Sequence, residues 1–199
     1  MIDPPTRSPR RRLLVVAVAL LAVTLTGCAS AASTGAVSEA AGEATITRVA
    51  AADRKPAPPV TGTTFDGKPF VLGDHQNSLV VLNFWASWCP PCRAEGPGLE
   101  VVSTAFAAQG VQFVGINTKE SDQAAARAYI ASIKSTYPNV VDPEGAIGLA
   151  FTTGATLPPD AIPSTLVVDR HGRIAARILG PITVPRLTAL LSSLAAETA

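Results

Sequence analysis

Two cysteines separated by two residues are the most reactive feature of this sequence. Cys89 and Cys92 flank Pro90 and Pro91. Such a pair can close a small disulfide ring and open it again, which is redox chemistry. The pair follows the apolar run 79–85 and precedes residues with helical spacing, so we expect Cys89 at a helix N-terminus. Free backbone N–H groups and the positive end of the helix dipole would stabilise its thiolate there and lower its pKa.

The positions around the pair predict how the chemistry is divided. Cys92 lies one helical turn after Cys89, shielded but near enough to attack a mixed disulfide, so we expect Cys89 to attack and Cys92 to resolve. Glu95 follows Cys92 by three positions and shares its helix face. A partly buried carboxylate there would accept and return the proton of Cys92; the alternative is a solvated glutamate. Trp88 would shield one side of the sulfurs and offer a flat apolar contact to a partner.

Two other uses of a Cys-x-x-Cys pair find little support in the sequence. Half of a zinc site would need further ligands, and His75 and His171 stand outside any ligand spacing. Covalent haem attachment would require a histidine where Arg93 follows Cys92. We therefore expect no metal and no cofactor beyond a redox-active disulfide between the two cysteines.

Residues 83–92, Asn-Phe-Trp-Ala-Ser-Trp-Cys-Pro-Pro-Cys, resemble the active-site signature of the thioredoxin superfamily. With residues 93–97, Arg-Ala-Glu-Gly-Pro, they are similar to the extracytoplasmic TlpA/ResA-like branch of thiol-disulfide oxidoreductases. The resemblance covers residues 61–199. It implies a glutamate at position 95 that handles protons and a cis peptide bond before Pro163, beside the disulfide. It also implies a set of residues that contact the protein substrate: Trp88, Pro90, Pro91, Ile162 and Pro163.

The resemblance implies reduction of disulfides in partner proteins, with apocytochrome c or its assembly factors among the substrates and a membrane thiol donor as the electron source. Pro90 and Pro91 favour a reductant, because a histidine between the cysteines would stabilise the thiolate and make an oxidant. Two alternatives stay open. A peroxiredoxin-like peroxidase would need its cysteine in a Pro/Thr-rich setting. A non-enzymatic copper-binding lipoprotein would use both cysteines as soft ligands, with wider spacing and a suitably placed histidine.

The sequence also departs from the patterns of its relatives. Asn83 stands where plain thioredoxins carry a buried aspartate, and it cannot titrate. Pro163 comes 71 positions after Cys92, a longer separation than in plain thioredoxin, and the extra length contains a helical pattern at 121–133. Residues 156–160, Thr-Leu-Pro-Pro-Asp, lengthen the loop before Ile162, which leaves the partner contacts near the proline open.

The remaining patterns predict an α/β, thioredoxin-like fold with a central mixed sheet, helices on both faces, an N-terminal hairpin and an inserted helix before the cis-proline. Asp66-Gly67 suits the tight turn of the hairpin. Strands are expected from apolar or alternating runs and helices from a 3.6-residue period. The expected strands are 63–65, 70–72, 79–85, 111–117, 140–141, 164–168 and 173–179, and the expected helices are 92–109, 121–133 (capped by Ser121), 142–151 and 183–196.

The N-terminal residues predict export. Four arginines within 7–12 precede an uncharged run at 13–26, which at 14 residues is shorter than the roughly 20 needed to cross a bilayer. Leu25-Thr26-Gly27-Cys28 resembles the bacterial lipobox, so we expect 1–27 to be a lipoprotein signal peptide and Cys28 to be acylated. Ordinary cleavage near residues 29–32, which would discard Cys28, is the alternative.

Downstream of Cys28 the chain is rich in Ala, Ser, Thr, Gly and Pro. We expect 28–60 to form the acylated N-terminus and a flexible tether, with a helix near 40–52 as the alternative, and 61–199 to form the domain. The protein would then sit on the outer face of the cell membrane. Without residues 1–27 the formal net charge changes from +1 to −2, because that segment holds four arginines and one aspartate. No basic patch remains, so nucleic acid is not an expected partner.

Overall fold

The computed structural model describes residues 44–153 and 156–197. The predicted signal peptide, the predicted acylation site Cys28 and residues 29–43 of the predicted tether lie outside the described residues. Within the described ranges, no helix combines the length and the apolar character needed to span a bilayer.

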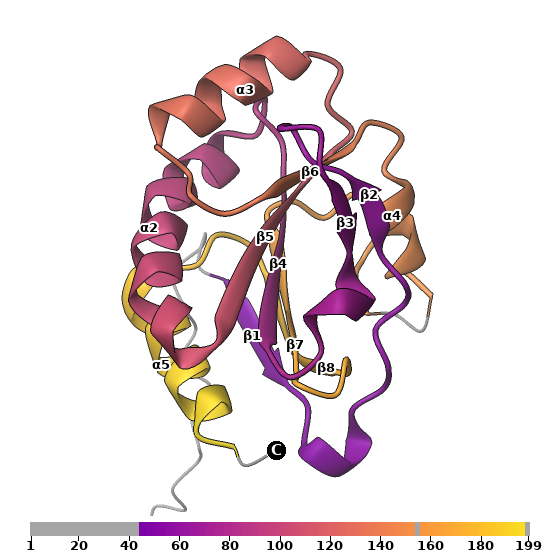
Figure 1. Cartoon of the computed structure of the whole chain (residues 1–199), viewed down its shortest axis with the longest axis vertical. Coiled ribbons are helices and arrows are strands. Elements are labelled where there is room, and N and C mark those ends of the chain that lie inside the picture. The colour runs from indigo at the N-terminus through magenta and orange to yellow at the C-terminus, as the bar shows by residue number, and fades with distance from the viewer. Residues whose placement is uncertain (1–43, 154–155, 198–199) are drawn as a thin grey trace, which may run out of the picture. The chain divides into compact units, whose positions relative to one another are not determined.

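A six-stranded mixed sheet forms the centre of the fold, in the order β1-β8-β7-β4-β5-β6 (Figure 1). Strands β4, β5 and β6 are parallel to one another. Strand β7 is antiparallel to β4, β8 to β7, and β1 to β8. The bounds are β1 Thr45–Arg48, β4 Leu79–Trp85, β5 Val111–Thr118, β6 Asn139–Asp142, β7 Ser164–Val168 and β8 Ile174–Leu179.

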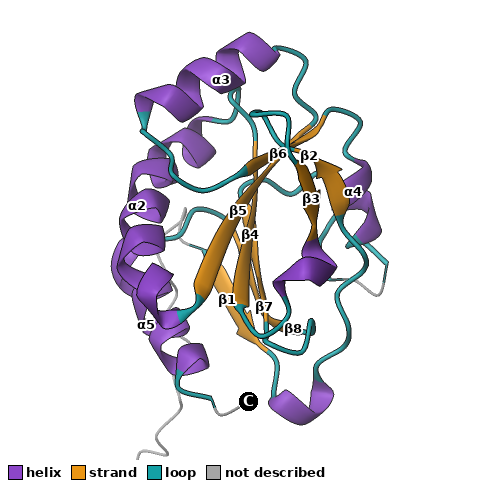
Figure 2. Cartoon of the chain, in the orientation of Figure 1, coloured by secondary structure: helices purple, strands orange, loops and turns teal. Residues whose placement is uncertain are grey.

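Each face of the sheet is covered by its own set of elements, as Figures 1 and 2 show. Helices α2 (Pro90–Phe106) and α5 (Val184–Ala195) lie on one face, and the helical turn η3 (Ala107–Gln109) follows α2. The other face carries the hairpin of β2 (Thr61–Thr63) and β3 (Pro69–Val71), the turn η2 (Leu72–His75) and α4 (Ala146–Ala150). A separate apolar cluster fills the space on each side. The predicted thioredoxin-like fold is confirmed.

Strand β4 positions the cysteine pair. All seven of its residues, Leu79–Trp85, are buried, because β5 and β7 flank the strand and helices or hairpin cover its two faces. A nearly continuous apolar run is what such a doubly covered strand requires. The C-terminal end of β4 leads through residues 86–88 directly into α2. A strand that is buried along its whole length therefore leads directly into the reactive segment.

The inserted helix α3 runs over Gln123–Ser132 and is capped by Asp122, not by Ser121 as predicted. The Asp122 carboxylate accepts a hydrogen bond from the backbone N–H of Ala125 at 3.0 Å. Aspartate and serine are comparable N-cap residues, so the sequence alone did not separate the two positions. Helix α3 lies next to the N-terminal half of α2 (Figure 1).

Helix α4 begins later than predicted, at Ala146 instead of Asp142. Gly145 has a positive φ of 71°, which interrupts the backbone ahead of the helix, and Pro143-Glu144 form a turn. The Asp142 carboxylate instead accepts hydrogen bonds from the backbone N–H groups of Ile147 at 3.2 Å and Gly148 at 3.4 Å. Asp142 thus stabilises the start of the helix from the end of β6.

The predicted tether extends too far along the chain, and the alternative of a helix near 40–52 is also wrong. Strand β1 pairs with β8, a helical turn η1 follows at Ala51–Asp53, and Val60 is buried. Arg54 forms ion pairs with Asp169 at 3.3 Å and with Glu197 at 2.7 Å. In β1 only Ile46 is even half-buried, so this edge strand lacks the apolar alternation that reveals a strand.

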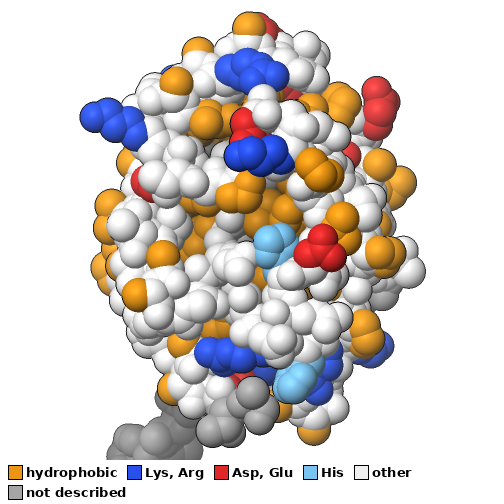
Figure 3. Space-filling model, viewed as in Figure 1, with side chains coloured by type: hydrophobic (Ala, Val, Ile, Leu, Met, Phe, Trp, Pro, Cys, Tyr) orange, Lys and Arg blue, Asp and Glu red, His pale blue; other side chains and the backbone are white. Residues whose placement is uncertain are grey.

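The surface mixes apolar and charged groups. On the face shown in Figure 3, hydrophobic side chains gather near the middle, and side chains of both charges are spread around them. A cavity of about 510 Å³ lies between the β2–β3 hairpin and the segment before β6. Tyr137 and the stacked rings of Phe70 and His75 are among its lining.

Candidate active site

Cys89 and Cys92 form a disulfide at the N-terminus of α2, with their Cα atoms 5.3 Å apart. Cys89 is the N-cap residue, and Pro90 is the first residue of the helix. The backbone N–H of Cys92 donates to Cys89 Sγ at 3.3 Å. Both cysteines are buried. The predicted position of the pair is confirmed, and the hydrogen bond supplies the backbone donor that would stabilise a thiolate at Cys89.

Glu95 points inward with Cys92, as its position three residues later predicted. Its side chain is only 6% exposed. One carboxylate oxygen accepts from the Asn83 side-chain amide at 2.9 Å, and the other accepts from the backbone N–H of Ile182 at 3.0 Å. Burial raises the pKa of Glu95 to about 7, although both hydrogen bonds act in the opposite direction. Near neutral pH this carboxyl group can both release and accept a proton.

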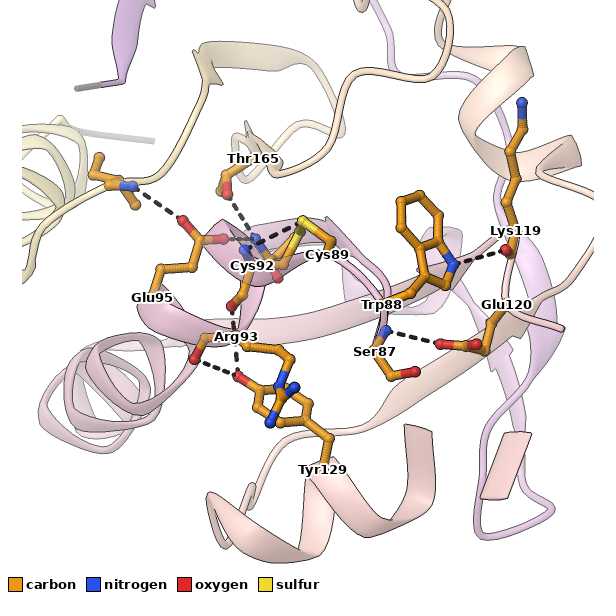
Figure 4. Close-up of a disulfide and its surroundings, with 12 residues drawn as sticks. Ser87, Trp88, Cys89, Cys92, Arg93, Glu95, Lys119, Glu120, Tyr129 and Thr165 are labelled. Carbon is orange, nitrogen blue, oxygen red and sulfur yellow. Dashed lines mark hydrogen bonds between the residues drawn. A yellow bond between two sulfur atoms is a disulfide. The ribbon is translucent and has the colours of Figure 1, made fainter. Parts of the chain in front are cut away.

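Asn83 links the carboxylate of Glu95 to the sheet. Its side-chain amide also donates to the hydroxyl of Thr165, two residues after Pro163, at 3.1 Å. Figure 4 shows Thr165 above the start of α2. Asn83 is buried. It cannot titrate, as noted from the sequence, but it holds in place a group that can.

The loop between β4 and α2 is fastened to the loop that follows β5. The Glu120 carboxylate, 3% exposed, accepts from the Ser87 backbone N–H at 2.8 Å and from the Asp122 backbone N–H at 3.1 Å. Burial raises the pKa of Glu120, but these hydrogen bonds outweigh it and the net pKa is lowered. The Trp88 indole N–H donates to the Lys119 carbonyl at 3.1 Å. Figure 4 shows the Ser87–Glu120 and Trp88–Lys119 contacts side by side.

The predicted substrate-contact residues lie around the disulfide on two segments. Trp88, Pro90 and Pro91 are exposed at the start of α2. The Ile162-Pro163 peptide bond is cis, as predicted. Pro163 is buried, and Ile162 packs against the apolar cluster that contains both cysteines.

Helix α3 contributes Tyr129 to the same neighbourhood. Its hydroxyl donates to the carbonyl oxygens of Arg93 at 3.1 Å and Cys92 at 3.5 Å. A methyl group at Gly96 would approach this hydroxyl to 1.9 Å, so the glycine is what lets α3 pack so closely on α2. The inserted helix thereby supports the first turn of the helix that carries the cysteines.

A family model described as the AhpC/TSA family matches residues 54–177, more than half of the chain. The chain belongs to this family. The matched range begins before the predicted domain start at residue 61, in agreement with the ordered structure that precedes it.

This AhpC/TSA-family chain has relatives with a shared activity. It is 37% identical over 134 residues to the thiol:disulfide interchange protein HelX of Rhodobacter capsulatus, covering 66% of this chain and 69% of that protein. It is 27% identical over 140 residues to the thiol-disulfide oxidoreductase ResA of Bacillus thuringiensis, covering 70% and 77%. A secreted thiol-disulfide isomerase from Corynebacterium glutamicum superposes with a TM-score of 0.67 at 29% identity, covering 76% of this chain and 92% of that one.

These comparisons confirm the resemblance to TlpA/ResA-like proteins and the predicted enzyme class, protein thiol-disulfide oxidoreductase. Sequence reasoning missed how Asn83, Glu120 and Tyr129 support the site. Glu120 and Tyr129 lie 28 or more positions after Cys92, and no local spacing connects them to it. In the part of the chain that the structure describes, no three His, Cys, Asp or Glu side chains are grouped as metal ligands would be.

Proposed function

We propose that this AhpC/TSA-family protein reduces disulfides of partner proteins outside the cytoplasm, with Cys89 as the attacking thiol, Cys92 as the resolving thiol and Glu95 as the proton carrier. The observation that supports the proposal best is the placement of three groups within the first two turns of one helix. A disulfide caps the helix N-terminus, and a buried carboxyl with a pKa of about 7 lies one turn behind it.

The exchange runs in two balanced steps. The Cys89 thiolate attacks one sulfur of the substrate disulfide, which forms a mixed disulfide and releases the other substrate sulfur as a thiolate. Glu95 then takes the proton of Cys92, and the resulting thiolate attacks Cys89 Sγ. The second substrate sulfur leaves, and the Cys89–Cys92 disulfide forms. Two electrons have passed to the substrate, and an external dithiol must return two electrons before the next cycle.

The direction of electron flow rests on the residues between the cysteines. Pro90 and Pro91 place no charge beside the sulfurs and offer no side-chain donor to a thiolate. The side chains between the cysteines therefore add nothing to the stabilisation that the helix N-terminus gives a Cys89 thiolate, which favours a reducing role over a strongly oxidising one.

The sequence and the relatives support the proposed location and partners. The lipobox-like Cys28 would anchor the protein to the outer face of the cell membrane, and the similar Corynebacterium structure is described as secreted. The resemblance to the TlpA/ResA-like branch implies apocytochrome c or its assembly factors as substrates and a membrane thiol donor as the reductant.

A Cys92→Ala variant of the full chain tests the proposed division of roles. Without the resolving thiol, the reduced protein is expected to stop at the mixed disulfide and to accumulate as a covalent complex with its substrate through Cys89. Mass spectrometry after non-reducing separation would identify both the bonded cysteine and the trapped protein. Complexes linked through Cys28, or none beyond those of a Cys89→Ala variant, would contradict the assignment. Hydrogen peroxide consumption and Cu(I) titration of the reduced protein test the two alternative functions.

A Cys28→Ser variant tests the anchor separately from the chemistry. We expect it to leave the membrane fraction, because the thiol that accepts the lipid is missing, while the purified protein still reduces insulin disulfides at the wild-type rate. Cell fractionation followed by immunoblotting measures the first effect. Continued recovery of the variant with the membranes would rule out lipid on Cys28 as the anchor.

A further inference from the structure

A cavity of about 130 Å³ opens beside the cysteine pair, between the active-site loop and α4. Two of the predicted substrate-contact residues, Trp88 and Ile162, line it. The other large apolar side chains of the lining include Phe84 from β4, Leu149 from α4 and Leu157 from the loop before Ile162. We call this cavity the α4 pocket. It is continuous with the surface where a substrate disulfide must meet Cys89.

The mouth of the α4 pocket exposes more apolar surface than a folded domain normally leaves in water. Trp88 is 56% exposed and Leu149 is 65% exposed, and these two are among the few large hydrophobic side chains on the described surface that are so accessible. Exposed apolar groups that gather around a concavity mark an interaction site more often than isolated ones do. Because both side chains lie on the same rim, that rim favours the binding of an apolar ligand.

Charged groups border the apolar part of the α4 pocket. The Lys119 ammonium forms an ion pair with the Asp160 carboxylate, and Glu144 lines the cavity as well. Binding surfaces commonly combine an apolar centre with a polar rim of this kind. The buried side chains of Phe84 and Leu157 form the floor of the pocket. An apolar ligand would gain most by leaving water at this floor, because the charged groups lie at the rim.

The loop that closes the α4 pocket is the one that departs from the family pattern. Residues 156–160 lengthen the connection to Ile162. The backbone N–H of Leu157 donates to the Phe151 carbonyl at 3.0 Å, and the Leu157 side chain is only 4% exposed. This loop therefore forms one wall of the α4 pocket. The pocket is therefore a property of this chain's own loop and not only of the cysteine motif.

We propose that the α4 pocket receives one large apolar side chain of the protein substrate, from a residue within two positions of the cysteine that bonds to Cys89. The proposal rests on the proposed function and adds a substrate preference to it. The volume fits, since an apolar cavity of roughly 150 Å³ can hold a benzene molecule. A leucine or phenylalanine side chain would fill the space, whereas alanine would leave it empty.

Such a pocket selects substrates by the apolar surface it removes from water. A hydrophobic pocket discriminates by about tenfold or more for each methylene group that is gained or lost. We therefore expect Leu or Phe at the matching position to raise the second-order rate constant of exchange at least about tenfold over Ala. Aspartate at that position should give no gain, because its charge would lose water on an apolar floor.

The test uses symmetric disulfide dimers of a short peptide with one cysteine. Ala, Leu, Phe or Asp is placed in turn at each of the two positions on either side of the cysteine. Stopped-flow fluorescence of the reduced full chain, which carries Trp88 beside the disulfide, gives the rate constant for each peptide. The measured quantity is the ratio of the Leu or Phe rate constant to the Ala rate constant at the best position.

Gly148 provides a variant that fills the α4 pocket from the inside. A Cβ added there would lie in ordinary contact, 3.8 Å from Thr118 Oγ1 and 3.9 Å from Phe84 Cδ1. In Gly148→Leu the rest of the side chain would occupy the cavity, and the Leu-to-Ala ratio should fall to within about twofold of 1. Ala146→Leu places the same side chain at an exposed position of the same helix outside the pocket, so it should keep the wild-type ratio. Leu149→Ala, which only trims the rim, should lower the ratio as well.

The outcomes separate the pocket from the chemistry. A wild-type ratio near 1 at all four positions would overturn the pocket, and so would a full ratio in both Gly148→Leu and Leu149→Ala. If none of the peptide disulfides oxidises the reduced protein, the proposed function itself fails. A high ratio that is lost in the pocket variants and kept in Ala146→Leu supports the proposal.

Discussion

Replacing Cys89 by serine is expected to abolish the reduction of insulin disulfides, with a loss of at least about 10³-fold relative to the wild type. Exchange needs a thiolate that attacks a sulfur atom, and a serine hydroxyl neither ionises near neutral pH nor forms a stable bond to sulfur. Cys92 is not placed to take over the attack, because it lies inside the first turn of α2, whereas Cys89 is the N-cap residue at the end of the helix. The turbidity of reduced insulin measures the effect.

The expected loss is large because the fold concentrates several supports on the Cys89 sulfur. The Cys92 backbone N–H points at Cys89 Sγ from 3.3 Å. The Trp88 indole stands beside it, held by the Lys119 carbonyl, and the neighbouring Ser87 is held by Glu120. These supports remain in the variant, but they have no reactive group to act on.

Cys28→Ser is the matched control, since it makes the same change at a cysteine that we place outside the chemistry. It should retain the full rate of insulin reduction. Circular dichroism and thermal unfolding of the Cys89→Ser protein must match those of the reduced wild type, so that a loss of rate reports the thiol and not the fold. Substantial activity in Cys89→Ser would sink the proposed mechanism.

The parts of the structure that the sequence predicted well are those with a strong local cause. The bounds of β4 and β7 match the expected 79–85 and 164–168, because both strands are buried on both faces and are therefore mostly apolar. The stripe of leucines in α5 is buried as predicted. The cysteine pair lies at a helix N-terminus because Pro90 and Pro91 suit the first turn of a helix.

The parts that were missed depend on contacts between distant segments. β1 is an edge strand that buries almost no apolar side chain. It forms because it pairs with β8, more than 120 residues later in the chain. Glu120 looks like an ordinary polar loop residue until β5 brings it beneath Ser87. The α4 pocket needs the end of β4, α4 and the loop before Ile162 together, and no single stretch of sequence contains it.

Replacing Glu95 by glutamine is expected to slow exchange by about 100-fold at neutral pH, as befits the loss of a general acid–base group. Glutamine keeps the size and polarity of the side chain but cannot take the proton of Cys92. The wild-type rate should change with a midpoint near pH 7, because burial raises the pKa of Glu95 to about 7. In Glu95→Gln this dependence should vanish. Rates measured by stopped flow between pH 5 and 9 test both points.

The same substitution slows exchange, but it should increase the stability of the folded protein above neutral pH. The folded state holds the Glu95 proton more tightly than the unfolded state does, since burial raises its pKa from 4.5 to about 7. The contribution of Glu95 to stability is therefore fully present below pH 4.5 and is lost as the pH rises toward 7. Above pH 7 the cost of the buried carboxylate reaches about 3 kcal/mol, at about 1.4 kcal/mol for each pH unit between the two pKa values.

Glu95→Gln avoids the cost of the charge, but its single side-chain oxygen can accept only one of the two hydrogen bonds that the carboxylate accepts, from the Asn83 side-chain amide at 2.9 Å and from the backbone N–H of Ile182 at 3.0 Å. The lost hydrogen bond costs about 1 kcal/mol at every pH. Relative to the wild type, the oxidised variant should thus be less stable at pH 4 by about 0.8 kcal/mol and more stable at pH 8 by about 2 kcal/mol. Urea unfolding at the two pH values measures this crossing.

Glu100→Gln is the matched control, because Glu100 lies on the same helix and bonds to Thr136 at the surface. It should keep the wild-type pH dependence of both rate and stability. A Glu95→Gln protein that is slow but shows no crossing would mean that the carboxyl only shapes the site. A crossing together with the lost pH dependence of the rate would show that the protein gives up stability at neutral pH to keep a proton carrier behind its cysteines.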